Sequence, residues 1–86
     1  MENLNDRLYE LLNKLESSDL KEIEEAAYEI GGMLIVESKR GEKVLDSKME
    51  EIENLSLELE LPKGQVSNYE GKLEKLRVLI RSLKSE

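Results

Sequence analysis

Residues 55–80 read LSLELELPKGQVSNYEGKLEKLRVLI, and this stretch decides between a helical and a mixed fold. Four leucines alternate at its start, as they would along a half-buried strand: Leu55, Leu57, Leu59 and Leu61. Leucine and glutamate form helices readily and strands poorly, so we predict a helix here. Pro62 should end that helix, because the residue before a proline avoids the α region.

The flanking sequence extends this stretch into two helices. The first begins near Ser47, which has Glu50 at capping-box spacing, and it carries apolar residues at Met49, Ile52, Leu55 and Leu59. The second is expected to begin between Pro62 and Ser67 and to run to about Leu76 or beyond. Its apolar residues keep helical steps of three and four throughout: Val66, Tyr69, Leu73, Leu76, Ile80 and Leu83.

The N-terminal half predicts two more helices. Leucines from Leu4 to Leu15 form one helical stripe, and a longer helix follows from Leu20 to Lys39. Ser18 or Asp19 can cap the longer helix, with Glu22 in the capping-box position and Gly41 at its end.

Gly31 and Gly32 are unusual inside such a helix, since each glycine costs roughly 1 kcal/mol relative to alanine. Ala27 and Gly31 share one face, where another backbone could approach closely. The competing interpretation is a break at Gly31 followed by a strand through Val36. The four predicted helices together indicate an all-α fold of about four helices. The alternative is a mainly α fold with a minimal wing, that is, one short strand pairing beside the helices.

The chain of 86 residues is expected to form one domain, residues 1–86. Residues 1–40 would be an acidic helical scaffold that dimerises, and residues 47–83, with the last two helices, would form a helix-turn-helix. So short a chain buries a modest core, and many such chains gain stability by pairing. The predicted helix from Leu20 to Lys39 is apolar almost all round at Met33–Val36, which is more apolar surface than one face of a small bundle can cover. This excess predicts a homodimer through the first or second helix.

Charge is distributed unevenly along the chain. Residues 1–61 hold 7 basic and 17 acidic side chains, a net charge of −10, whereas residues 62–86 hold 6 and 3, a net charge of +3. Such asymmetry can separate a solvated scaffold from a segment that meets an anionic partner. Alternatively, the cations gather there because the dipole of a last helix favours them.

The chain contains neither histidine nor cysteine, which removes the usual general base, the strongest nucleophile and the best transition-metal ligands. We therefore expect no enzyme activity, no cofactor and no metal site. The carboxylates of Glu22, Glu25 and Glu29 share a helix face that we interpret as solvated. No leader opens the chain and no apolar run could span a bilayer, so we expect no membrane partner and a cytoplasmic location.

Residues 55–80 resemble the helix-turn-helix of winged-helix DNA-binding proteins. The features that carry this resemblance are an apolar helix end at Leu61, a short turn, Val66-Ser67 early in the next helix, and the Lys72–Leu76 stretch. The resemblance implies that Leu61 and Val66 belong to the core and that the two helices meet at a steep angle. Arg77 stands where the family usually has the glycine that opens its wing. At most one short strand, 78–83, could then pair with residues 43–45.

The resemblance implies a small DNA-binding transcriptional regulator, with a recognition helix at about 62–76 in the major groove of double-stranded DNA. Glutamine and asparagine can pair with adenine edges, whereas lysine and serine suit phosphates or guanine. The predicted DNA-binding residues are Lys63, Gln65, Ser67, Asn68, Lys72 and Lys75. The alternative is an acidic helical protein-interaction module (an inhibitor, immunity factor or complex subunit) without nucleic-acid binding, because an acidic scaffold repels phosphate.

Overall fold

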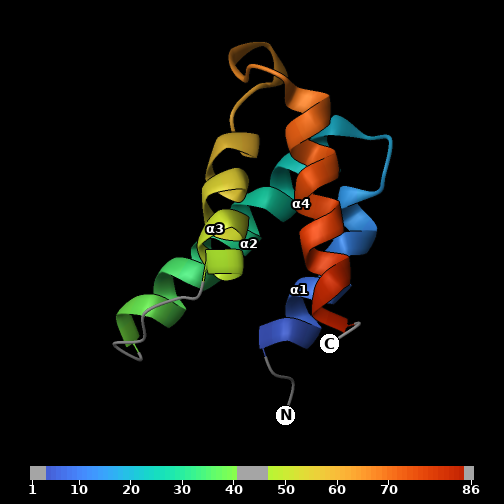
Figure 1. Cartoon of the computed structure of the whole chain (residues 1–86). Helices are drawn as coiled ribbons and strands as arrows, with labels where there is room; N and C mark the ends of the chain where they lie inside the picture. Colours follow the sequence, from blue (N-terminus) through green and yellow to red (C-terminus); the bar gives the residue numbers. More distant parts are fainter. Residues whose placement is uncertain (1–3, 41–46, 85–86) are drawn as a thin grey trace.

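A computed structural model describes residues 4–40 and 47–84 of the chain. It contains four α-helices and one short 3₁₀ turn: α1 (Leu4–Leu15), α2 (Leu20–Arg40), α3 (Ser47–Leu59), η1 (Lys63–Gln65) and α4 (Tyr69–Lys84) (Figure 1). No strand occurs in this described part of the chain. The predicted all-α fold of about four helices is therefore confirmed.

Asp19 defines the start of α2. Its Oδ1 accepts a hydrogen bond from the Lys21 backbone N–H at 2.9 Å, which satisfies one of the free donors of the first turn. The Asp19 backbone N–H in turn donates to Ser17 Oγ at 3.0 Å. Of the two predicted caps, Asp19 is thus the one used.

The second helix runs without interruption through both glycines to Arg40. The alternative of a break at Gly31 and a strand through Val36 is therefore wrong. A Cβ built on Gly31 would lie 3.1 Å from Leu57 Cδ2 and 3.8 Å from Ser56 Cβ, both on α3. Ala27 on the same face is fully buried. The helix that covers Gly31 is therefore α3, and its side chains, not its backbone, make the close contact.

The helices pack as a closed ring in which each makes its most extensive contacts with two neighbours: α1 with α2, α2 with α3, α3 with α4, and α4 with α1. Their apolar stripes meet at the centre. The fully buried side chains there include Leu8, Leu15, Ile30, Leu34, Ile52, Leu59, Leu76 and Ile80. The aliphatic core expected from the composition is thus present, with Tyr69 as its aromatic member.

Several expectations about the C-terminal half are wrong. The last helix begins at Tyr69, just after the predicted starting range of Pro62 to Ser67, because a 3₁₀ turn and the extended residue Val66 come first. Leu61 is 43% exposed and does not belong to the core. Residues 78–83 lie inside α4, so they form no wing strand; their proposed partner, 43–45, lies outside the described residues.

The third and fourth helices lie beside one another and run in opposite directions (Figure 1). The ion pairs agree with this direction, because Glu51 early in α3 meets Lys75, whereas Glu58 late in α3 meets Lys72, nearer the start of α4. This is the arrangement of a plain helical hairpin. Ser47, expected as the cap of α3, is the first residue of that helix, and the position before it lies outside the described residues.

Candidate functional site

The six predicted DNA-binding residues do not share one helix face. Lys63 and Gln65 lie on η1, Ser67 and Asn68 lie in the turn that follows, and only Lys72 and Lys75 lie on α4. All six are at least partly exposed to solvent. The expectation that Gln65 and Asn68 stand one helical turn apart is wrong, because Val66 between them is extended (φ −109°, ψ 117°).

Asn68 has a local structural role. Its backbone lies in the left-handed region (φ 50°), which asparagine tolerates better than other residues with a Cβ. Its carbonyl accepts the first hydrogen bond of α4, from the Lys72 N–H at 3.0 Å. The side-chain amide lies over the first turn of α4, so close that a Cβ on Gly71 would be 2.6 Å from Asn68 Nδ2. The amide therefore packs on its own helix.

Each lysine of the predicted interface has a carboxylate partner. Lys63 Nζ lies 3.1 Å from Glu70 Oε1 and 5.4 Å from the centre of the Tyr69 ring. Lys72 Nζ lies 2.9 Å from Glu58 Oε2 and also donates to Ser67 Oγ at 3.4 Å. Lys75 pairs with Glu51. Two of these partners come from α3.

These ion pairs are exposed, and each contributes little to stability. Their importance lies in the net charge of the surface, since three lysines and three carboxylates sum to zero. Binding to DNA depends on cations that replace counterions along the phosphates. A phosphate arriving at Lys63, Lys72 or Lys75 would meet a carboxylate within a few ångströms.

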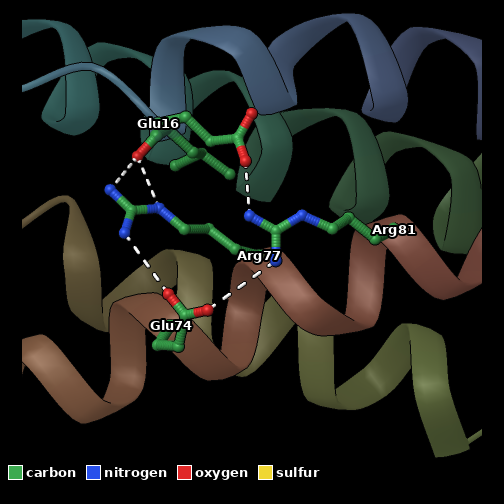
Figure 2. A network of polar contacts seen from close by, with 5 residues as sticks. Glu16, Glu74, Arg77 and Arg81 are labelled. Atoms are coloured by element: carbon green, nitrogen blue, oxygen red, sulfur yellow. Dashed lines mark hydrogen bonds and ion pairs between the residues drawn. The ribbon is translucent and has the colours of Figure 1, made fainter.

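Two further cations of α4, Arg77 and Arg81, contact the end of α1. Arg77 donates from Nε at 2.8 Å and from Nη2 at 2.5 Å to the backbone carbonyl of Leu15, the last residue of α1 (Figure 2). The terminal carbonyls of a helix have no partner within the helix, and no glycine follows α1 to close its end. Arg77 therefore caps α1 from a position 62 residues away.

Glu74 and Arg81 extend this contact into a network (Figure 2). Glu74 lies between the two arginines, with its carboxylate oxygens 3.4 Å from Arg77 Nη1 and 3.7 Å from Arg81 Nη1. Arg81 also pairs with Glu16, just beyond α1. The hydrogen bond that Arg81 donates to Glu16, together with the charges of the Glu16 and Glu74 carboxylates, raises the pKa of Arg81 above its usual value. Sequence reasoning missed this network, although the absence of a C-terminal glycine after α1 was a usable signal.

The hydroxyl of Tyr69 is a second feature that the sequence did not predict, because the helical spacing placed this residue only in the core. The side chain is 5% exposed, and its hydroxyl has no hydrogen-bond partner among the described residues. Burial, followed by the negative charges of Glu24 and Glu70, raises the pKa of Tyr69 above its ordinary value of 10.0, against the opposing effect of Lys63 and Arg77. Tyr69 is therefore uncharged at neutral pH and serves the core.

A different surface, which we term the α1–α2 groove, lies along the outside of the first two helices. It consists of two hollows of about 450 and 460 Å³ that share Tyr28 and Glu29. The first is further lined by Leu4, Arg7, Gly32, Met33, Val36 and Glu37. The second is further lined by Lys14, Lys21, Glu24 and Glu25. Tyr28 is 69% exposed and Val36 is 51% exposed, so the groove presents apolar surface to solvent.

The two walls of the α1–α2 groove differ in charge. The α1 wall carries Arg7 and Lys14, whereas Glu25 and Glu29 dominate the α2 wall, with Lys21 near its end. Within the residues that the structure describes, neither Arg7 nor Lys14 has an ion-pair partner. These cations therefore remain available to a partner, unlike the three lysines next to α3.

Residues 4–40 and 47–84 contain neither a cluster of metal ligands nor a helix that could span a membrane. No group of three or more metal-ligating side chains is close enough to hold an ion. None of the described helices combines the length and the apolar character needed to cross a bilayer.

Comparisons with protein-family models, with curated proteins and with solved structures find no match for this chain. Its class therefore rests on its own geometry, which is a small four-helix domain with net charge −7. Within that class, the chain is distinguished by an ion-paired α3–α4 surface and an open groove along α1 and α2.

Proposed function

We propose that this chain is an acidic helical protein-interaction module that acts through the α1–α2 groove and does not bind nucleic acid. The observation that carries the proposal is the pairing of Lys63, Lys72 and Lys75 with carboxylates. A DNA-binding regulator needs uncompensated cations on its contact surface, because phosphate contacts supply most of the affinity.

The arrangement of polar side chains also supports protein binding over base readout. A recognition helix presents several side chains from one face to the groove of the DNA. Here Gln65 precedes α4, and the amide of Asn68 packs over the first turn at Gly71. The α1–α2 groove, in contrast, offers exposed apolar side chains beside unpaired charges, the usual composition of a protein-binding surface.

A binding titration on fluorescent duplex DNA at low salt tests this proposal. The parent chain should show no binding. The triple variant Glu51→Gln, Glu58→Gln, Glu70→Gln uncovers the three lysines and should gain weak binding that disappears as salt rises.

The matched control is the triple variant Glu22→Gln, Glu50→Gln, Glu53→Gln. It changes the net charge by the same amount but uncovers no lysine on α4 or η1, so it should behave like the parent. Tight binding by the parent, with affinity that falls steeply as salt rises, would instead favour the DNA-binding regulator and overturn the proposal.

A further inference from the structure

The outer face of α2 carries a feature that the fold of a single chain does not explain. Gly32 lies at the centre of a 21-residue helix, with Tyr28 one turn before it and Val36 one turn after it. A Cβ built on Gly32 would meet nothing within 4 Å in the described part of the chain. Internal packing explains Gly31, which α3 covers, but it gives no reason for a glycine at position 32.

A glycine without internal contacts lowers helix stability relative to alanine, and its characteristic use is to let another chain approach closely. The flanking side chains fit such a use. Tyr28 and Val36 are large, apolar and mostly exposed, and they stand on either side of the gap that Gly32 leaves. Tyrosine is enriched at the centres of protein interfaces, where it supplies contact area together with a polar tip.

From these observations we propose that a second copy of this chain docks in the α1–α2 groove, with the contact centred on Gly32. This inference rests on the proposed function and names its partner. A two-fold axis that runs along the groove sets the α1 wall of each copy against the α2 wall of the other. Arg7 and Lys14 of one copy then face the carboxylates of Glu25 and Glu29 of its partner.

The charges select this occupant over a foreign helix. A wholly basic helix would complement Glu25 and Glu29 but would be repelled by Arg7 and Lys14. An acidic helix would meet the opposite conflict. A surface with one basic wall and one acidic wall complements its own copy, and each charge pair is formed twice in a symmetric dimer.

Light scattering on the full chain, together with sedimentation over a range of concentrations, tests the proposal. The parent should have about twice the chain mass of 9.9 kDa at micromolar concentration. Gly32→Glu blocks the close approach, and Lys14→Glu sets like charges against each other. Each should weaken the dimer about tenfold or more, whereas the double variant Lys14→Glu, Glu25→Lys should recover much of the parent affinity.

Circular dichroism verifies that each variant is folded, and Gly32→Glu favours helix, so a loss of the dimer would not reflect unfolding. Gly64→Glu serves as the matched control, because Gly64 also lies in open space but outside α2, and its dimer should be unchanged. A parent that stays monomeric, or a dimer that Gly32→Glu and Lys14→Glu leave intact, overturns the inference. A monomeric parent that also fails to bind DNA would overturn the dimer and leave the proposed function standing.

Discussion

At the scale of single residues, Asn68 shows how one backbone angle changes the role of a side chain. A side chain expected to contact a base is instead held against the first turn of α4 by a left-handed backbone. Asn68→Ala should lower the free energy of unfolding by about 1 kcal/mol, since alanine is strained in this region. Asn68→Gly should be nearly neutral. Urea unfolding compares the two, and equal stabilities would contradict the structural role.

The unpartnered hydroxyl of Tyr69 predicts a stabilising substitution. Tyr69→Phe keeps the ring in the core and removes a buried polar group that lacks a hydrogen bond, which should raise the free energy of unfolding by about 1 kcal/mol. Tyr28→Phe is the control, because that hydroxyl belongs to an exposed residue and its removal should change little. A clear loss of stability in Tyr69→Phe would show that the hydroxyl has a partner.

The same residue predicts a pH dependence. Because the pKa of Tyr69 is raised in the folded state, the unfolded chain ionises first as pH rises past about 10. The unfolded state then binds fewer protons than the folded state, so stability present below this pH is lost above it. Thermal melts of the parent should therefore fall more steeply above pH 10 than those of Tyr69→Phe. Identical slopes would argue against this account.

At the scale of elements, the end of α1 depends on α4. Arg77→Met leaves the Leu15 carbonyl without its two donors and should cost about 1–3 kcal/mol of unfolding free energy. Arg81→Met removes only the exposed contacts to Glu16 and Glu74, and its melting temperature should stay near that of the parent. If Arg81→Met proved as harmful as Arg77→Met, the cap on α1 would not be the source of the effect.

The two adjacent glycines of α2 predict opposite responses. Gly31→Leu should overpack the contact with Leu57 on α3 and cost about 1–3 kcal/mol of unfolding free energy. Gly32→Leu, in open space, should raise it by up to about 1 kcal/mol. Thermal melts on dilute protein separate the two, so that self-association does not contribute. Destabilisation by both substitutions would mean that α2 is packed on both faces.

Helix positions followed from the sequence wherever one apolar stripe ran unbroken. The stripes of α1 and α2 fixed their bounds closely, because a buried face requires regular spacing. The start of α4 could not be predicted from the sequence. Val66 and Tyr69 stand three residues apart, and this spacing is compatible both with a helix and with a 3₁₀ turn followed by one extended residue. The left-handed backbone of Asn68 then turns the chain into α4.

The candidate site was predictable only in part, for a related reason. Exposure of Lys63, Lys72 and Lys75 follows from their positions off the apolar stripe. Their pairing depends on which face of α3 lies against α4, and this is set by the packing of the whole ring. The excess of apolar residues at 33–36 indicated an exposed apolar surface on α2. The sequence did not indicate that Tyr28 and Gly32 line the α1–α2 groove, as they do in the structure.

At the scale of the whole molecule, the cations divide into those that form ion pairs within the chain and those that do not. Segment 62–86 is net positive, and most of its described cations pair with carboxylates of the same chain. Arg77 and Arg81 contact the end of α1, while Lys72 and Lys75 pair with carboxylates of α3. The asymmetry seen in the sequence is thus largely cancelled by folding, and unpaired cations are found instead on α1.

The most direct test of this account asks which face of the molecule responds to a partner. Amide spectra of the isotope-labelled chain would be recorded on dilution and again with excess duplex DNA at low salt. We predict that dilution shifts the amides of Tyr28, Gly32 and Val36, and that DNA shifts none at residues 63–75. The contrary result would contradict the proposal that the α1–α2 groove binds a partner. In that result the amides of Gln65, Ser67 and Lys72 shift with DNA, and the amides of the α1–α2 groove do not shift on dilution.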